Sequence, residues 1–198
     1  MSEYTTQNEL RRFVVAKILR LYHQKSNGVS AAAAQLAQLR RGVGKPSQHR
    51  PELWGIILEK EDGTEGIPEE YRGKGDKPSN AEHAAYTALT LFALHQQSQN
   101  QPMHVVDVSF GQAIGRLVGQ TTSSTKKRFD SLLTAQTENA RQHYLRSLIA
   151  LLRSKNIAFD YGRFAVDYMH LLNPAMRQKV LYRWNHDFSY GLVPPRSE

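Results

Sequence analysis

Apolar residues recur at intervals of three and four positions along almost the whole chain, and this spacing limits the folds that the chain can adopt. In the segment NELRRFVVAKILRLYHQ, the side chains of Leu10, Val14, Ile18 and Leu21 fall on one stripe of a helix, and the arginines fall largely outside it. No segment alternates apolar and polar residues in the way that a half-buried strand does. The pattern therefore predicts an all-α protein.

Further segments carry the same spacing, and we expect helices over residues 30–41, 51–60, 80–98, 109–118, 124–135, 137–155, 160–172 and 174–190. Ser30, Ser124 and Asp160 stand where the side chain of a residue before a helix accepts a hydrogen bond from the first turn. Gly42 is expected to end the second helix, and Asp187 is expected to be a solvated helix residue.

We interpret these helices as two small bundles packed end to end, which meet near residues 101–103. The N-terminal bundle covers residues 1–103 and includes an acidic connector, rich in glycine and proline, at residues 59–79. The C-terminal bundle covers residues 104–190, and residues 191–198 form a polar tail.

Glycine recurs every four residues at Gly111, Gly115 and Gly119. In a membrane this spacing is typical of a helix dimer, but the segment is short and contains Arg116. We therefore expect a short helix that packs closely against a neighbouring helix of the same chain.

Basic residues are grouped along a chain whose formal net charge is +8. Residues 10–50 contain nine basic and no acidic residues, residues 52–82 contain nine acidic and four basic residues, and residues 108–158 contain eight basic and two acidic residues. Such a patterned charge favours a polyanionic partner, of which nucleic acid is the commonest. A soluble basic protein without an anionic ligand is the alternative.

Several classes of catalytic and metal site are absent from the sequence. The chain has no cysteine, which excludes thiolate zinc sites and cysteine nucleophiles, and its eight histidines lack the spacing of paired ligands on a helix. We therefore expect no enzymatic activity, no catalytic residue, no metal and no cofactor. The polar N-terminus and the lack of a run of roughly 18 apolar residues indicate a soluble, cytoplasmic protein without a membrane partner.

The stretch LRRGVGKPS, which begins at Leu39, resembles a nucleotide-binding phosphate loop only superficially. That loop requires a preceding strand, a glycine where Leu39 stands and a serine or threonine where Pro46 follows Lys45. Here a predicted helix precedes the loop. We expect Arg40 and Arg41 to bind a polynucleotide backbone, since the glycines allow a strand to approach, and we include Lys45 in this site.

A second basic group, Lys126, Lys127 and Arg128, stands at the predicted start of a helix. Positive charge is unfavourable there because the helix dipole is positive at the same end, so an external anion would explain it better. A solvated run of charge is the alternative. Contacts to phosphates rather than bases are expected, because the following aromatic residues mostly fall on apolar stripes: Phe13, Phe92, Phe129, Tyr144, Phe164, Trp184 and Phe188.

The order of seven segments resembles a known family. HAAYTALTLFALHQQS, PMH, SFGQAIGRL, KKRFDSLLTA, LRSLIALLR, FDYGRFAVDY and VLYRWNHDF are similar, in this order, to the CasB-type small subunit of the type I-E CRISPR Cascade complex. The resemblance covers roughly residues 30–190 and includes the LRRG segment. It implies an all-helical, non-enzymatic subunit present in two copies along a complex guided by crRNA.

The resemblance also implies partners and a site. The partners would be crRNA, target DNA including the single-stranded non-target strand, other Cascade subunits and a second copy of the chain. Basic positions of the family correspond to Arg40, Arg41, Arg116, Lys126, Lys127 and Arg128. Backbone contacts at these positions would stabilise the R-loop, because the exchange of one duplex for another is nearly balanced in free energy. The alternative from a different class is a helical adaptor that binds an acidic protein partner.

Overall fold

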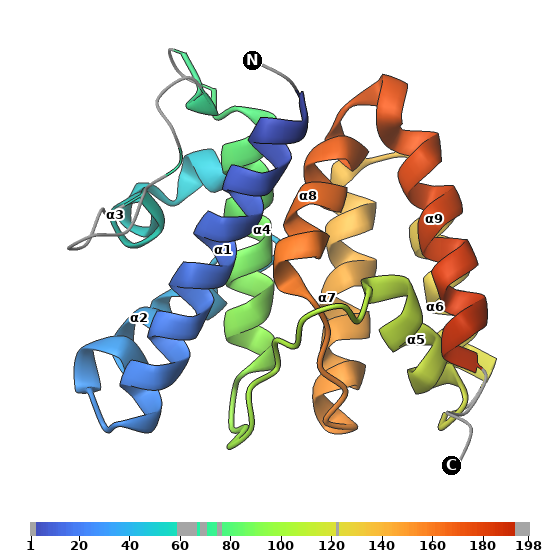
Figure 1. Cartoon of the computed structure of the whole chain (residues 1–198), viewed down its shortest axis with the longest axis horizontal. Coiled ribbons are helices and arrows are strands. Elements are labelled where there is room, and N and C mark those ends of the chain that lie inside the picture. Colours follow the sequence, from blue (N-terminus) through green and yellow to red (C-terminus); the bar gives the residue numbers. More distant parts are fainter. Residues whose placement is uncertain (1–2, 59–66, 68–70, 75–76, 122, 193–198) are drawn as a thin grey trace.

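The computed structural model describes residues 3–58, 67, 71–74, 77–121 and 123–192, and most of these residues are helical (Figure 1). The α-helices are α1 (Glu3–Ser26), α2 (Ser30–Arg41), α3 (Pro51–Leu58), α4 (Asn80–His95), α5 (Phe110–Val118), α6 (Ser123–Thr134), α7 (Glu138–Ser154), α8 (Tyr161–Leu172) and α9 (Pro174–Leu192), with a short 3-10 turn, η1 (Ser47–His49). The described residues contain no strand, only an isolated bridge between His104 and Phe159. The predicted all-α class is confirmed.

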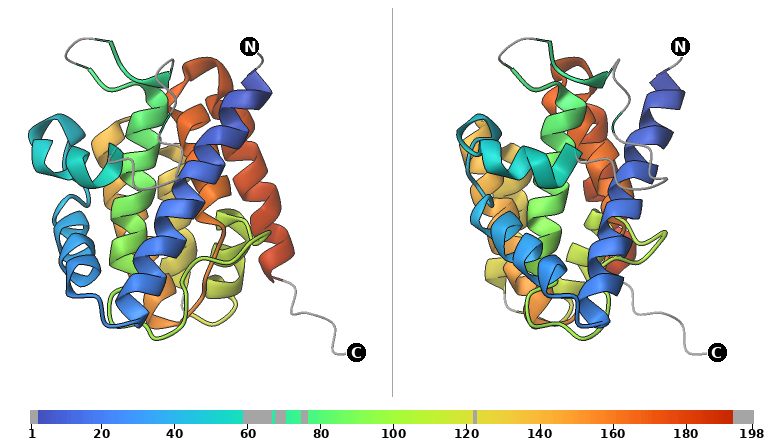
Figure 2. Two further views of the ribbon diagram at one scale, coloured as in Figure 1. Left: turned by 60° about the vertical axis from the view of Figure 1, so that its left-hand side comes forward. Right: turned by 90° about the vertical axis from the view of Figure 1, so that its left-hand side faces the viewer.

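Helices α1, α4, α8 and α9 lie side by side (Figures 1 and 2). The shorter helices α2, α3, α5 and α6 lie toward the two ends of this row. α8 packs against α1, α4 and α9, and α7 packs against α4 behind it. α2 and α3 adjoin α4 at one end of the long axis, whereas α5, α6 and α9 lie at the other. This arrangement places the two predicted basic groups, on α2 and on α6, at opposite ends of the molecule.

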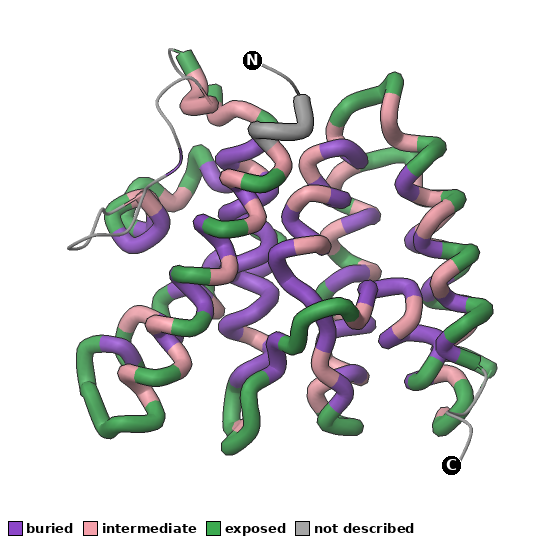
Figure 3. The backbone as a smooth tube through the Cα atoms, in the orientation of Figure 1, coloured by how far each residue is buried: buried purple, intermediate pink, exposed green. Residues whose placement is uncertain are grey.

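A continuous cluster of buried apolar side chains contains residues from both halves of the chain. Figure 3 marks buried positions along the backbone of both halves. Its aromatic centre includes Phe110, Phe159 and Trp184, whose rings lie within contact distance of one another or of Phe164. The division into two bundles at residue 103 stays a prediction. The acidic connector at 59–79 and the tail at 191–198 lie mostly outside the described residues, although α9 continues to Leu192.

The expected close packing of the glycine-containing helix is confirmed for α5 and α9. A Cβ atom added at Gly111 would lie 2.2 Å from the backbone oxygen of Trp184, and one at Gly115 would lie 2.3 Å from that of Phe188. At Gly119 the nearest atom would be 3.6 Å away, so this glycine does not contribute to the contact. The two helices thus approach each other through bare backbone at Gly111 and Gly115.

Two predicted helix boundaries are confirmed and two predicted caps are wrong. The side chain of Asp160 accepts a hydrogen bond from the backbone N–H of Arg163 at 2.9 Å, and Gly42 ends α2. α2 already includes Ser30, and the preceding residue makes no side-chain cap. α6 begins one residue before Ser124, which therefore lies inside the helix.

Asp187 is not a fully solvated residue as expected. Its side chain is half-buried and accepts a hydrogen bond of 2.6 Å from the guanidinium of Arg163 on the neighbouring α8. Sequence position alone could not reveal this ion pair, since it depends on the packing of α8 against α9.

Candidate nucleic-acid interface

The loop after α2 is held by contacts to α3 and α4. The hydroxyl of Tyr86 donates a hydrogen bond of 3.1 Å to the carbonyl of Gly42, and a Cβ atom at Gly42 would lie 2.5 Å from Leu53. Gly42 is therefore buried against protein and is closed to a nucleic-acid strand. Gly44 is exposed with a φ of +72° and open space around it, so close approach is possible there instead.

The three predicted basic residues of this region differ in exposure. Arg41 and Lys45 are exposed, whereas Arg40 is half-buried. Burial lowers the pKa of Arg40 from its ordinary value, and the positive charge of Arg153 on α7 lowers it further. Two guanidinium groups from helices far apart in the sequence therefore lie close enough to repel each other.

Arg153 adds a cation that the sequence interpretation did not select. It donates hydrogen bonds to the side-chain oxygen of Gln97 at 2.8 Å and to the carbonyl of Leu94 at 3.5 Å, both of which are neutral acceptors. In the part of the chain that the structure describes, neither Arg40 nor Arg153 has a carboxylate partner. An external anion beside both groups would relieve their mutual repulsion.

At the start of α6, the three predicted residues are not equivalent. Lys126 forms an ion pair with Asp130 one turn later, and its amine lies 5.2 Å from the centre of the Phe188 ring. Arg128 donates a hydrogen bond to the hydroxyl of Ser147 on α7. Lys127 is exposed and has no ion pair with any described residue. Lys127 and Arg128 are therefore better placed than Lys126 to bind a phosphate.

α7 connects the two basic groups. Arg128 contacts Ser147 in its middle, the exposed Arg146 directly precedes Ser147, and Arg153, whose charge lowers the pKa of Arg40, lies near its C-terminal end. Arg146 and Arg153 are seven residues apart, which places them on the same face of the helix, about 10 Å apart along its axis. A shallow hollow of about 270 Å³ on this face is lined by His143, Arg146, Ser147 and Ala150.

Beyond its first residue, Glu138, α7 contains no acidic residue, and no aspartate or glutamate occurs from residue 139 to residue 159. The helix stripe Leu145, Leu148 and Leu152 is buried, whereas Arg146 lies outside this stripe and is exposed. The seven-residue spacing of Arg146 and Arg153 was thus a signal in the sequence. Their link to Arg40 and Arg128 was not, because it arises from the packing of three helices.

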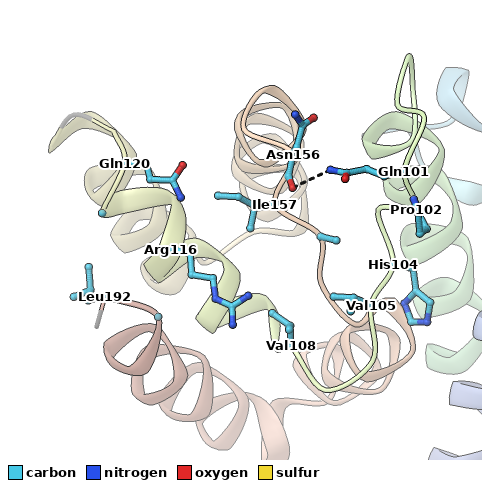
Figure 4. A pocket seen from close by; sticks show the side chains of 13 residues that line it. Gln101, Pro102, His104, Val105, Val108, Arg116, Gln120, Asn156, Ile157 and Leu192 are labelled. Atoms are coloured by element: carbon cyan, nitrogen blue, oxygen red, sulfur yellow. Dashed lines mark hydrogen bonds between the residues drawn. The ribbon is translucent and has the colours of Figure 1, made fainter. Parts of the chain in front are cut away.

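Arg116 lies at a third place, a groove at one end of the bundle (Figure 4). The groove has a volume of about 810 Å³ and lies between the loop at residues 101–108, α5, residues 156–158 and the end of α9. Arg116 is exposed and points into it, beside the apolar side chains of Val105, Val108 and Ile157. The seven predicted residues therefore do not form one patch.

Buried titratable groups lie in the core, away from these basic surfaces. Burial and the charge of Arg153 lower the pKa of His95 to about 3, and its Nδ1 lies 3.1 Å from the hydroxyl of Tyr161. Burial raises the pKa of Asp167, which contacts Arg183 and accepts a hydrogen bond of 2.7 Å from the indole of Trp184. These contacts join α4 to α8 and α8 to α9, so the buried groups have a structural role.

The residues that the structure describes include neither a metal-binding cluster nor a membrane-spanning helix. They contain no group of three or more histidine, aspartate or glutamate side chains arranged to hold a metal ion. Among them, no helix has both the length and the apolar character needed to cross a membrane.

Comparisons with known proteins identify a family. The profile described as CRISPR-associated protein Cse2 matches residues 35–188. The crystal structure of CasB from Thermobifida fusca is 30% identical, covers 91% of this chain and 97% of its own, and superposes with a TM-score of 0.72. The crystal structure of a CRISPR-associated protein of the Cse2 family from Thermus thermophilus is 24% identical, covers 96% and 99% of the two chains, and has a TM-score of 0.64.

A search of curated proteins finds no match to the chain. The family profile covers well over half of the chain, and the Thermobifida fusca structure matches almost its full length. The resemblance that the seven sequence segments carry is thereby confirmed. From its sequence and its fold, the chain belongs to the Cse2 family of CRISPR-associated proteins.

Proposed function

We propose that the chain is a non-catalytic small subunit of Cascade that contacts the backbones of crRNA, target DNA and the displaced strand, and so stabilises the R-loop. Family membership supports the role of a Cascade subunit. The observation that carries the nucleic-acid contact is the basic path from Arg128 on α6, along Arg146 and Arg153 on α7, to Arg40 on α2.

The basic path can bind phosphates because nearby carboxylates do not neutralise its arginines. Asp130 pairs with Lys126, and Glu138 pairs with the buried Arg141, so neither is available to neutralise Arg146 or Arg153. Guanidinium groups bind phosphate oxygens through two parallel hydrogen bonds, which favours a phosphate chain over a diffuse counterion cloud.

Backbone contacts of this kind are sufficient for an effect on the R-loop. Base pairing between guide and target reads the sequence, and the heteroduplex formed is about as stable as the duplex that it replaces. A few phosphate contacts to the displaced strand can therefore determine how long the open state persists. The other Cascade subunits and a second copy of the chain are the protein partners of this proposal.

The test is the salt dependence of binding between the full chain and single-stranded DNA. The double variant Lys127→Ala with Arg128→Ala removes the first cation of the path, Arg128, and the exposed Lys127 next to it. It should bind all sequences more weakly, and the slope of log K against log salt should fall by about one to two.

The acid-rich region at residues 52–82 offers a matched control. Lys74 and Lys77 are exposed and belong to the acid-rich region, so Lys74→Ala with Lys77→Ala changes the net charge equally at another place. This variant should bind like the wild type. Equal loss in the two variants would mean that total charge, not the path, determines binding.

The adaptor hypothesis predicts a different result. Purification of the native assembly would then yield a complex free of nucleic acid, with an acidic protein bound to the chain. Co-purification of RNA with related CRISPR subunits, lost when Lys127 and Arg128 are replaced, supports the proposal instead.

A further inference from the structure

Three aromatic side chains form an exposed stripe on α9. Tyr182, His186 and Tyr190 follow one another at intervals of four residues, and the two tyrosines are 74% and 62% exposed. The ring of His186 lies 6.2 Å from that of Tyr182 and 5.0 Å from that of Tyr190, measured between centroids. The outer edge of α9 is exposed along its length (Figure 3), and Trp184 and Phe188 on its opposite face are buried.

Positive charge accompanies this aromatic stripe. Lys179 is exposed and lies one turn before Tyr182, and Arg183 lies one turn before His186, so both belong to the same side of the helix. The acidic residue of α9, Asp187, pairs with Arg163, and the side chain of Arg183 that pairs with Asp167 is still 39% exposed. The stripe is therefore electrostatically complementary to an anionic chain.

The stability of α9 does not explain why these three aromatic side chains are exposed on it. Aromatic pairs four residues apart add only about 0.2–0.5 kcal/mol to a helix, and Trp184 and Phe188 already anchor α9 through buried contacts. Single exposed aromatic residues are common on protein surfaces, but a row of three flanked by cations matches the combination of stacking rings and basic groups in proteins that bind single strands.

We propose that Tyr182, His186 and Tyr190 form a platform on which unpaired bases of a single nucleic-acid strand stack, with the phosphates of that strand on Lys179 and Arg183. This inference rests on the proposed nucleic-acid function and extends it from phosphates to bases. It assigns a base contact to α9, where the aromatic residues considered from the sequence were buried in the core. The contact tolerates any sequence, since every base has a π face.

The experiment compares two strands of equal charge. The full chain is titrated with single-stranded DNA and with an abasic strand of the same length, which keeps the phosphates and lacks the bases. Tyr182→Leu with Tyr190→Leu should weaken binding to the normal strand by at least about fivefold and leave binding to the abasic strand unchanged. Tyr182→Phe with Tyr190→Phe keeps the rings and should bind like the wild type.

Three other results would overturn the proposed stacking platform. Equal affinity of the wild type for the two strands, or equal weakening of both strands in the leucine variant, overturns the stacking platform. Loss of Cascade assembly in the leucine variant with unchanged DNA binding assigns the stripe to a protein partner and also overturns it. The slope of log K against log salt should stay unchanged in the leucine variant, whereas the Lys127 and Arg128 variant alters it. Failure of stacking is thereby separated from failure of the proposed function.

Discussion

Arg11 of α1 donates a hydrogen bond of 2.7 Å to the carboxylate of Asp160, which is buried at the start of α8. The same carboxylate caps α8 through the N–H of Arg163 and accepts a hydrogen bond of 3.3 Å from the N–H of Asp107. Beside it, a Cβ atom added at Gly162 would lie 2.6 Å from Val15, so α1 and α8 are in close contact. One carboxylate therefore joins α1, the backbone at Asp107 and the start of α8.

Asp160→Ala should lower the free energy of unfolding by about 2–4 kcal/mol, because it removes a helix cap and leaves the guanidinium of Arg11 without its main partner. The expected loss lies below that of a fully buried ion pair, since the side chain of Arg11 is 42% exposed. Urea denaturation measures the change. The exposed pair of Lys126 and Asp130 provides the control, and Asp130→Ala should change stability by less than about 1 kcal/mol.

Gly115→Ala should destabilise the protein by roughly 1–3 kcal/mol or more, because the added methyl group would collide with the backbone of α9 at Phe188 and Gly191. Gly119→Ala, four residues later, meets nothing closer than 3.6 Å and should be neutral. Thermal unfolding of the two variants checks the difference. Similar melting temperatures would contradict the close approach of α5 and α9.

Folding stability should fall as the pH decreases below about 6.5. Burial holds the pKa of His95 at about 3, whereas in the unfolded chain it returns to about 6.5, so only the unfolded state binds a proton between these values. The free energy of unfolding should decrease by roughly 1.4 kcal/mol per pH unit for this residue. Burial lowers the pKa of His83 and His104 in the same direction.

Denaturation of the wild type and of His95→Gln at pH 7 and pH 5 measures this dependence. The variant should lose less stability than the wild type between the two values, whatever its stability at pH 7. Parallel losses in the two proteins would show that His95 does not remain neutral in the folded state.

Arg146→Ala tests the part of the path that sequence interpretation missed. Arg146 is exposed, so the substitution should leave stability nearly unchanged while it weakens nucleic-acid binding uniformly across sequences. The slope of log K against log salt should fall by about one. Lys74→Ala, an exposed lysine of the acidic region, should leave the slope as it is.

The helices could be predicted from sequence because each buries one stripe of apolar side chains. The stripe of Leu10, Val14, Ile18 and Leu21 is buried as expected, and so are all the aromatic residues assigned to apolar stripes except the half-buried Tyr144. The two errors at Ser30 and Ser124 concern single residues at helix ends, where local propensity is weak compared with tertiary packing.

The candidate site was less predictable, since it depends on contacts between distant segments. The charge blocks indicated an anionic partner, but only packing brings Arg153 beside Arg40 and Arg128 beside Ser147. Packing also buries Gly42 under Leu53 and Tyr86, so the glycine that was expected to admit a strand is closed. The aromatic stripe on α9 required knowledge of which face of that helix is exposed.

The lifetime of the R-loop in assembled Cascade tests the central claim most directly. Complexes are built with the wild-type chain, with Lys127→Ala and Arg128→Ala, and with the matched Lys74→Ala and Lys77→Ala control. The first variant should shorten the lifetime, because displaced strands lose phosphate contacts, while the control keeps the wild-type lifetime. Equal lifetimes of all three complexes, each containing its full complement of the subunit, would contradict the role of the basic path.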